Sequence, residues 1–227
     1  MAVTAQEDAI VAEMTDLVRS ELTASAFWSG FRAGKFPIEH VRAVFGQYYL
    51  WRNVFHRWFG VCIAKSPAFG TGPVTPYILS ELAEHIEEEI SGDHHGLAVR
   101  FLAAIGVTDP DALLPIPATL DYMGHFEAEF LPADRTGEEA LAGLAGRELV
   151  APLRNRMTID AFTTRYGIAD GLEFFHLHEE LEVEHFRGLW EAIASRSQEE
   201  RKLVEAAHSE IVAHVRFWDD VSRSIES

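Results

Sequence analysis

The sequence has 227 residues, a length that allows one large domain with a sizeable core. Apolar residues make up 48% of it and aromatic residues 11%, which excludes a disordered, collagen-like or disulfide-framework protein. Its 19 basic and 36 acidic residues give a formal charge of −17, so we expect no binding to nucleic acid. With a lone cysteine, no secretory signal and no apolar run of about 18 residues, we expect a cytoplasmic protein without a membrane partner.

Apolar residues recur at spacings of three and four almost throughout, which predicts an all-α protein. Helices are expected over about 4–26, 37–65, 76–90 and 94–105, after the Pro-rich stretch 115–117 to about 130, and over 137–164, 170–195 and 198–224. Turn residues fill 66–73, and Ser91-Gly92-Asp93 breaks the chain between the third and fourth helices at a point of flexibility. We expect a single antiparallel helical bundle, one domain over residues 1–227.

The helix over 76–90 is crowded with acids. A face opposite Leu82, Ile86 and Ile90 is expected to be solvated and carries Glu81, Glu84, His85 and Glu88. Glu87 lies near the edge of the apolar side, and His94 follows seven residues later on the same azimuth if the helix persists through Gly92. The pair Glu88 and His95 is the rival register.

An acid also faces inward on the helix over 137–164. Its apolar stripe includes Leu141 and Leu144, and the next position of that stripe is Glu148. A buried carboxylate needs a cation, so Glu148 is a candidate metal ligand. The alternative is an ion pair with a core-facing arginine such as Arg147 or Arg154.

Three polar residues occupy the inward stripe of the helix over 170–195. His178, Glu182 and His185 lie on consecutive turns and point the same way, an arrangement that a divalent transition metal satisfies. A buried His-Glu-His hydrogen-bond network or a partly solvated face is the alternative. His125 and Glu129, four residues apart, form a weaker candidate pair.

Together these helices supply three inward carboxylates and three inward imidazoles. That is the ligand count of a dinuclear carboxylate site in a helical bundle. Oxygen and imidazole donors suit iron, with manganese as the alternative, and carboxylates can bridge two ions.

Three segments carry a family resemblance. They are Glu87 to His94 followed by Phe101-Leu102 and Ile105-Gly106, then Ala140 to Leu144 through Glu148 to Pro152 with Tyr166-Gly167, and finally Phe174-Phe175 with His178, Glu182 and His185. In this order they resemble the motifs of the haem-oxygenase-like dimetal oxidases, relatives of TenA and PqqC. Two departures stand out: many members have Asp where this chain has Glu182, and the branch that forms para-aminobenzoate has Lys where this chain has Thr158.

The resemblance implies a haem-oxygenase-like bundle of seven to eight helices. It carries over six residues as ligands of two Fe(II) ions: Glu87, His94, Glu148, His178, Glu182 and His185. It implies that O2 is the cosubstrate and that a small molecule is desaturated, hydroxylated, N-oxygenated or cleaved, in specialised metabolism. It is compatible with an external electron donor, and a homodimer is expected. The alternatives are a metal-free TenA-like or PqqC-like enzyme and a non-catalytic helical binding or regulatory protein.

A further polar residue interrupts the aromatic stripe of the helix over 37–65. Arg52 lies among Tyr48, Phe55 and Phe59, on the helix that borders the substrate chamber in the family it resembles. We hypothesise that Arg52 binds a substrate carboxylate while the three aromatic residues wall an apolar pocket, which favours a free amino acid over a fatty acid. The alternative is that Arg52 reaches the surface or pairs with a neighbouring acid.

Overall fold

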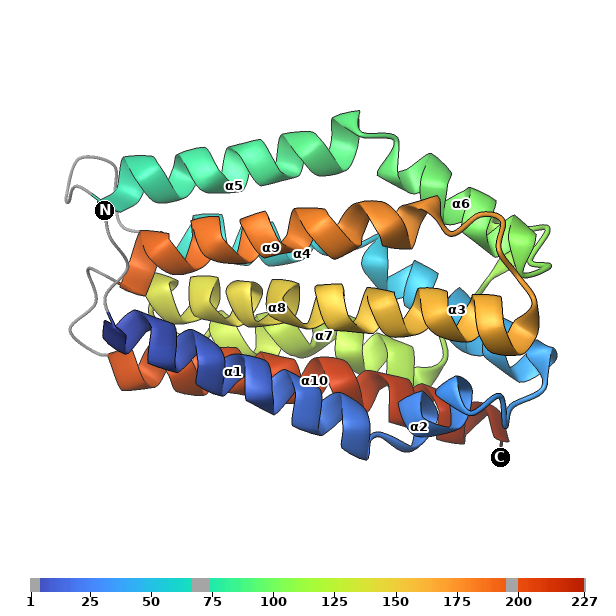
Figure 1. Ribbon diagram of the computed structural model, residues 1–227. Helices are drawn as coiled ribbons and strands as arrows, with labels where there is room; N and C mark the ends of the chain where they lie inside the picture. The colour runs from blue at the N-terminus through green and yellow to red at the C-terminus, as the bar shows by residue number, and fades with distance from the viewer. Residues whose placement is uncertain (1–4, 67–73, 195–199, 227) are drawn as a thin grey trace.

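The computed structural model describes residues 5–66, 74–194 and 200–226, and these form helices without a strand (Figure 1). The α-helices are α1 Ala5–Ala24, α2 Ala26–Arg32, α3 Ile38–Arg52, α4 Phe55–Lys65, α5 Val74–Ser91, α6 His94–Ala104, α7 Pro117–Phe130, α8 Gly137–Ala161, α9 Glu173–Ala194 and α10 Glu200–Glu226. A 3-10 turn, Pro110–Ala112, precedes α7, and a π-helical turn, Phe162–Tyr166, extends α8. The expected all-α bundle is confirmed.

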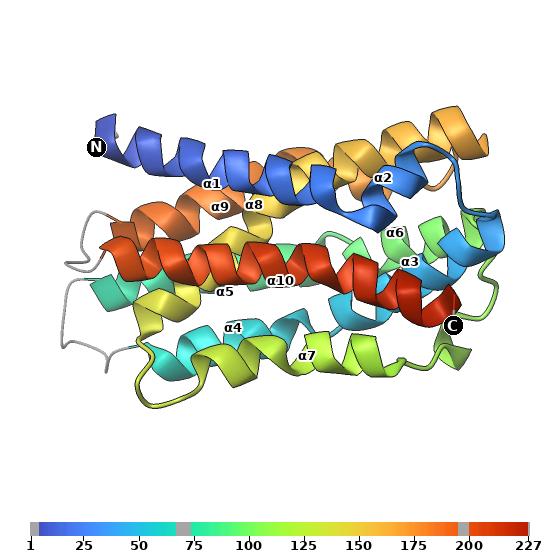
Figure 2. The same ribbon diagram turned by 90° about the horizontal axis from the view of Figure 1, so that it is seen from below.

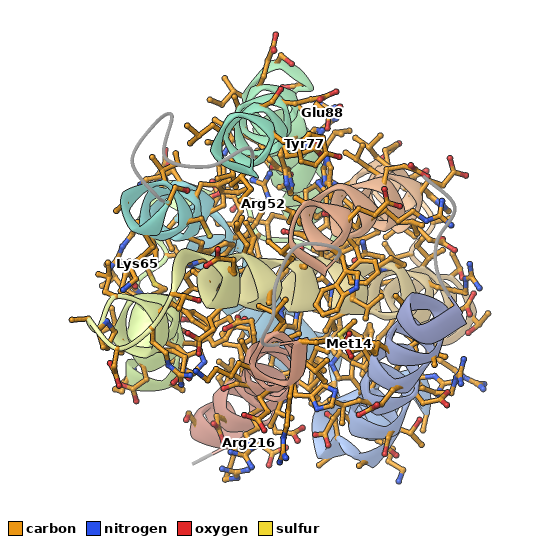
Figure 3. The ribbon with its side chains drawn as sticks, turned by 90° about the vertical axis from the view of Figure 1, so that its left-hand side faces the viewer. Met14, Arg52, Lys65, Tyr77, Glu88 and Arg216 are labelled. Carbon is orange, nitrogen blue, oxygen red and sulfur yellow. The ribbon has the colours of Figure 1, made fainter. Side chains whose placement is uncertain are left out.

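Helix α8 runs through the middle of the bundle, with α9 and α5 on one side and α10, α1 and α7 on the other (Figures 1, 2 and 3). Its residues from Ala140 to Glu148 are all buried, as a central helix requires. Small residues let the neighbouring helices approach closely: a Cβ on Gly146 would lie 2.6 Å from the carbonyl oxygen of Ala207 in α10. The acid that this helix carries, Glu148, is therefore fixed at the centre of the molecule.

One expected helix is divided in the structure, and a short helix that was not expected follows the first one. The helix over 37–65 becomes α3 and α4, because the backbone turns at Asn53 and Val54, where the Val54 N–H bonds the Trp51 carbonyl three residues back. At Ser25 the chain leaves α1 and starts α2, and the Ser25 hydroxyl accepts a hydrogen bond from the Trp28 N–H. The first break places Arg52 at the C-terminal end of α3, beside the start of α4.

The break expected at Ser91-Gly92-Asp93 is present. Helix α5 ends at Ser91 and α6 begins at His94, with Asp93 in the left-handed region at φ 53°. The chain changes direction there, as Figure 1 shows at the right-hand end of α5. The turn expected over 66–73 lies, from residue 67 on, outside the described residues. Within the described chain, the helices are too short or too polar to cross a bilayer.

Candidate dinuclear metal site

A pocket lies inside the bundle between α3, α4, α5, α8 and α9. Figure 3, which looks along the helices, shows Arg52 in this interior space above α8. The free space inside the pocket amounts to about 50 Å³. Acidic, imidazole and aromatic side chains line it together, so it combines candidate metal ligands with apolar walls.

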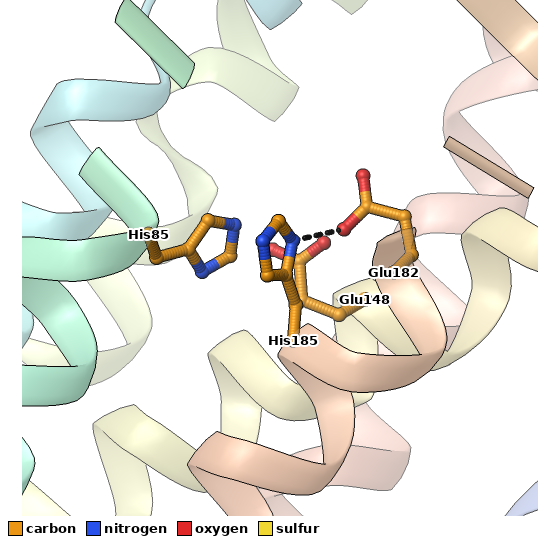
Figure 4. Close-up of side chains that lie close together, drawn as sticks. All are labelled: His85, Glu148, Glu182 and His185. Carbon is orange, nitrogen blue, oxygen red and sulfur yellow. Dashed lines mark hydrogen bonds and ion pairs between the residues drawn. The ribbon is translucent and has the colours of Figure 1, made fainter. Parts of the chain in front are cut away.

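One group of candidate ligands joins α5, α8 and α9. His85, Glu148, Glu182 and His185 are all buried, and each offers a donor atom within 4.8 Å of the others (Figure 4). The Glu182 carboxylate and the Nδ1 atom of His185 are 2.8 Å apart, while the His85 ring stacks on the His185 ring at 3.5 Å. Two carboxylates and two imidazoles thus face one point.

A second group joins α5, α6 and α9. It contains Glu89, His94 and His178, whose donor atoms also lie within 4.8 Å of one another. The Glu89 carboxylate is 3.3 Å from Nδ1 of His94 and 3.5 Å from Nε2 of His178. Because His178 and Glu182 are neighbours on one face of α9, the two groups lie side by side along the pocket.

Five of the six expected ligands lie in these two groups: His94, Glu148, His178, Glu182 and His185. Glu87 does not, because it is exposed on the outer face of α5, and Glu89 stands beside His94 instead. The rival histidine, His95, is exposed, whereas His94 is 3% exposed. The structure thus places His94, and not His95, among the candidate ligands, and on α5 it places Glu89 there in place of Glu87.

The inward face of α5 that was expected from the sequence is wrong. Ile90, expected on the apolar side, is 71% exposed, and His85, expected in solvent, is 5% exposed. The buried stripe is instead Ile78, Leu82 and His85, continuing to Glu89 at spacings of four, three and four. That spacing is as regular as the one of Leu82, Ile86 and Ile90, so it is the sequence signal that identifies His85 and Glu89.

Burial makes the two acids of the first group compete for one proton. Burial, and then the charge of Glu182, raise the pKa of Glu148 well above its ordinary value. For Glu182 burial acts in the same direction, but hydrogen bonds from His185 and Glu148 lower its pKa to about 2. Two buried carboxylates in contact can both be ionised only when a cation lies between them.

The charges of the second group favour an ionised carboxylate. Burial acts to raise the pKa of Glu89, but the neighbouring imidazoles of His178 and His94 and the charge of Arg52 hold it well below its ordinary value. In the first group, burial lowers the pKa of His185, yet hydrogen bonding to Glu182 and Glu88 raises it to about 9. A cation at either group would replace the protons that now hold these acids and imidazoles together.

The histidine nitrogens fit a metal. Nδ1 of His178 donates a hydrogen bond of 2.7 Å to the Phe174 carbonyl, so Nε2 is the nitrogen that faces Glu89, and that Nε2 is buried without a hydrogen-bond partner. The Nδ1 atoms of His94 and His85 are also buried and unpartnered. Buried, unpaired imidazole nitrogens next to carboxylates are explained by a metal, and the set of oxygen and nitrogen donors suits iron or manganese.

Arg52 pairs with a neighbouring acid, which was the alternative to binding a substrate carboxylate. Its Nη2 donates a hydrogen bond of 3.1 Å to Glu89, so the guanidinium is paired with a neighbouring acid. The residues expected around it, Tyr48, Phe55 and Phe59, do line the pocket. Arg52 is thus a partner of a candidate ligand, and its charge is already compensated.

A separate buried polar network lies on the α10 side of the same pocket. Nε and Nη2 of Arg147 donate to Glu210, so Arg147 is not the partner of Glu148. The Tyr122 hydroxyl donates to Glu210 over 3.0 Å and lies 3.2 Å from Nδ1 of His214. The weaker candidate pair, His125 and Glu129, is not formed: His125 lies 3.4 Å from Glu210, and Glu129 pairs with Arg135.

Comparisons with known proteins agree with this geometry. The model of a family described as iron-containing redox enzymes matches residues 42–219. No curated protein gives a significant match.

Several solved structures share the fold. A CadD-like protein of unknown function from Nostoc punctiforme PCC 73102 has a TM-score of 0.79 at 17% identity, over 97% of this chain and 98% of that one. A domain with a haem-oxygenase-like fold from Shewanella denitrificans OS217 has a TM-score of 0.72 at 19% identity, over 100% and 94%. A TenA homologue from P. horikoshii OT3 has a TM-score of 0.68 at 16% identity, over 94% and 96%. These likenesses confirm the haem-oxygenase-like fold.

Proposed function

This chain belongs to a family of iron-containing redox enzymes, and we propose that it is a non-haem diiron oxygenase or oxidase that uses O2 to oxidise a small molecule. The observation that carries the proposal is the pair of adjacent groups of candidate ligands, five of whose seven members line one pocket. One iron would be held by His85, Glu148, Glu182 and His185. The other would be held by Glu89, His94 and His178.

Two Fe(II) ions in such a site would supply the electrons that reduce O2 and so the oxidant for the substrate. The protein orients the ligands. The Phe174 carbonyl fixes the ring of His178, Glu88 lies 2.7 Å from Nε2 of His185, and Arg52 holds Glu89. Such outer contacts set the tautomer and direction of each ligand.

The walls of the pocket serve the same chemistry. Phe55 and Phe59 of α4 and Phe174 of α9 border the candidate ligands with apolar surface. This surface would limit the access of water to the reacting centre and would face an apolar part of the substrate. A free amino acid remains our proposed substrate class, as the sequence suggested.

The test is iron quantitation together with O2 consumption. Protein reconstituted with Fe(II) under nitrogen should hold close to two irons per chain, and exposure to O2 should consume the gas faster once an oxidisable amino acid from a screened set is added. Mass spectrometry identifies the product. An active protein that holds no metal would contradict the proposal and favour a metal-free TenA-like enzyme.

A further inference from the structure

Three buried arginines line the pocket, and only two of them are paired with an acid. Arg52 bonds Glu89, and Arg147 bonds Glu210. Arg154, which is 4% exposed, forms no ion pair with any acid in the part of the chain that the structure describes. A buried cation without a counter-ion costs several kcal/mol, so an uncompensated guanidinium beside a pocket indicates that something anionic completes it.

The partners of Arg154 are neutral. Its Nε and Nη2 donate to the side-chain oxygen of Asn155 over 3.1 and 2.8 Å, and its Nη1 donates to Nε2 of His214 over 3.0 Å. His214 is a neutral acceptor, since burial, and then the charges of Arg154 and Arg147, hold its pKa well below the ordinary value. These contacts fix the direction of the guanidinium and leave its charge unbalanced.

Arg147 supplies a second unused donor. It lies seven residues before Arg154, on the same face of α8, with Ala151 between them at the pocket wall. Its Nη1 is buried without a hydrogen-bond partner, although Nε and Nη2 are bound to Glu210. The small side chain of Ala151 leaves space between the two arginines.

Apolar surface surrounds these donors. The Arg147 guanidinium lies 3.4 Å from the ring centroid of Trp58, and Trp51 and Phe174 also line the pocket. Glu89, Glu148 and His178 line the same pocket. A molecule with one charged end and an apolar body would therefore extend from the arginines toward the candidate metal centre.

We propose that the pocket binds a small organic carboxylate, received by Arg154 with Arg147 and extended with its apolar body toward the two metal-binding groups. The proposal rests on the diiron function above and names the residues that would receive the carboxylate of its substrate. It assigns the carboxylate to Arg154, in place of Arg52, which the sequence had suggested. A planar guanidinium matches a carboxylate with paired hydrogen bonds, which an amide of the same shape cannot replace at equal strength.

The experiment compares acids with their amides. Iron-loaded protein under nitrogen is titrated with 3-phenylpropionate and 3-phenylpropionamide, and with hexanoate and hexanamide, by calorimetry and by quenching of tryptophan fluorescence from the pocket residues Trp51 and Trp58. We expect at least one acid to bind about tenfold or more tightly than its amide. Equal affinity of both acids and their amides would overturn the proposal.

Variants of one helix locate the contact. Arg154→Gln should remove the preference for the acid while iron content is retained, and Arg154→Lys should weaken it about tenfold with the fold and charge intact. The matched control is Arg156→Gln, because Arg156 lies on the same helix but is exposed and pairs with Glu179. Tight acid binding by Arg154→Gln or, if that variant does not fold, undiminished binding by Arg154→Lys would refute the assignment.

These experiments distinguish failure of the diiron function from failure of the carboxylate site. Wild-type protein that holds two irons but shows no preference for acids would retain the diiron function and lose the carboxylate site. Protein that holds no iron yet binds an acid through Arg154 would lose the diiron function and retain the carboxylate site.

Discussion

Adjacent histidines provide the sharpest residue-level test of the site. His94 is 3% exposed and belongs to the group with Glu89 and His178, whereas His95 is exposed. We expect His94→Ala to lose about one iron per chain and His95→Ala to lose none, with helical content unchanged in both. Iron is measured by a colorimetric chelator and helicity by circular dichroism. Equal iron in the two variants would place the ligand elsewhere.

The lone cysteine makes a second prediction at this scale. Cys62 is 0% exposed, and burial raises the pKa of its thiol well above the ordinary value. The thiolate is the reactive form, so native protein should react with a disulfide reagent at least about tenfold more slowly than protein in denaturant. Rapid labelling of native protein, followed by absorbance, would contradict this burial and make Cys62 a candidate nucleophile.

The sequence was most informative where a polar residue interrupts a long apolar stripe. Glu148, His178 and His185 are examples, because helices α8 and α9 carry enough apolar residues to define an inward face. On α5 acids outnumber apolar residues near the C-terminal end, so two stripes fit the spacing equally well. Packing against α9 selects the stripe of His85 and Glu89, and only the tertiary structure contains that information.

Among the helices, the break between α5 and α6 matters most to the site, because it positions His94. A Cβ on Gly92 would lie 2.5 Å from Nε2 of His94 and 3.0 Å from the Glu88 carbonyl oxygen. Gly92→Ala should therefore displace the His94 ring and lower the iron content by about one per chain. Iron quantitation on purified protein tests this.

Gly124→Ala is the control for the Gly92 variant. Gly124 lies in α7, and a Cβ there would meet nothing within 4 Å, so the substitution should leave iron binding unchanged and favour the helix by up to about 1 kcal/mol. Full iron occupancy in Gly92→Ala would show that the close approach at Gly92 does not position His94.

The division of the expected helix over 37–65 into α3 and α4 depends on tertiary contacts. No Gly or Pro marks Asn53 and Val54, so local sequence signals do not predict the turn there. The turn places Arg52 against Glu89, 37 residues away in the chain. A contact of this kind outweighs local helix propensity, which is a weak constraint on its own.

At the scale of the whole molecule, the two groups of candidate ligands bring together helices that are distant in sequence. The candidate ligands come from α5, α6, α8 and α9, so bound ions would connect the α5–α6 layer to the central helix. Without ions, Glu148 and Glu182 hold one proton between them at the centre of the bundle. Metal binding should therefore stabilise the native fold as well as supply redox chemistry.

The size of this stabilisation follows from mass action. At a free Fe(II) concentration about 100 times Kd, each site adds about 2.7 kcal/mol, and for a chain of this length each kcal/mol raises Tm by about 2–4 °C. We expect iron-loaded protein under nitrogen to melt about 5 °C or more above the chelator-treated protein by differential scanning calorimetry. The variant Glu182→Ala should lose about half of that difference, because it removes a ligand from one of the two groups, the one that spans α5, α8 and α9. His95→Ala should keep the full difference, since its imidazole is exposed and outside both groups. An equal Tm for loaded and chelator-treated wild-type protein would show that these buried side chains hold the bundle together without a metal.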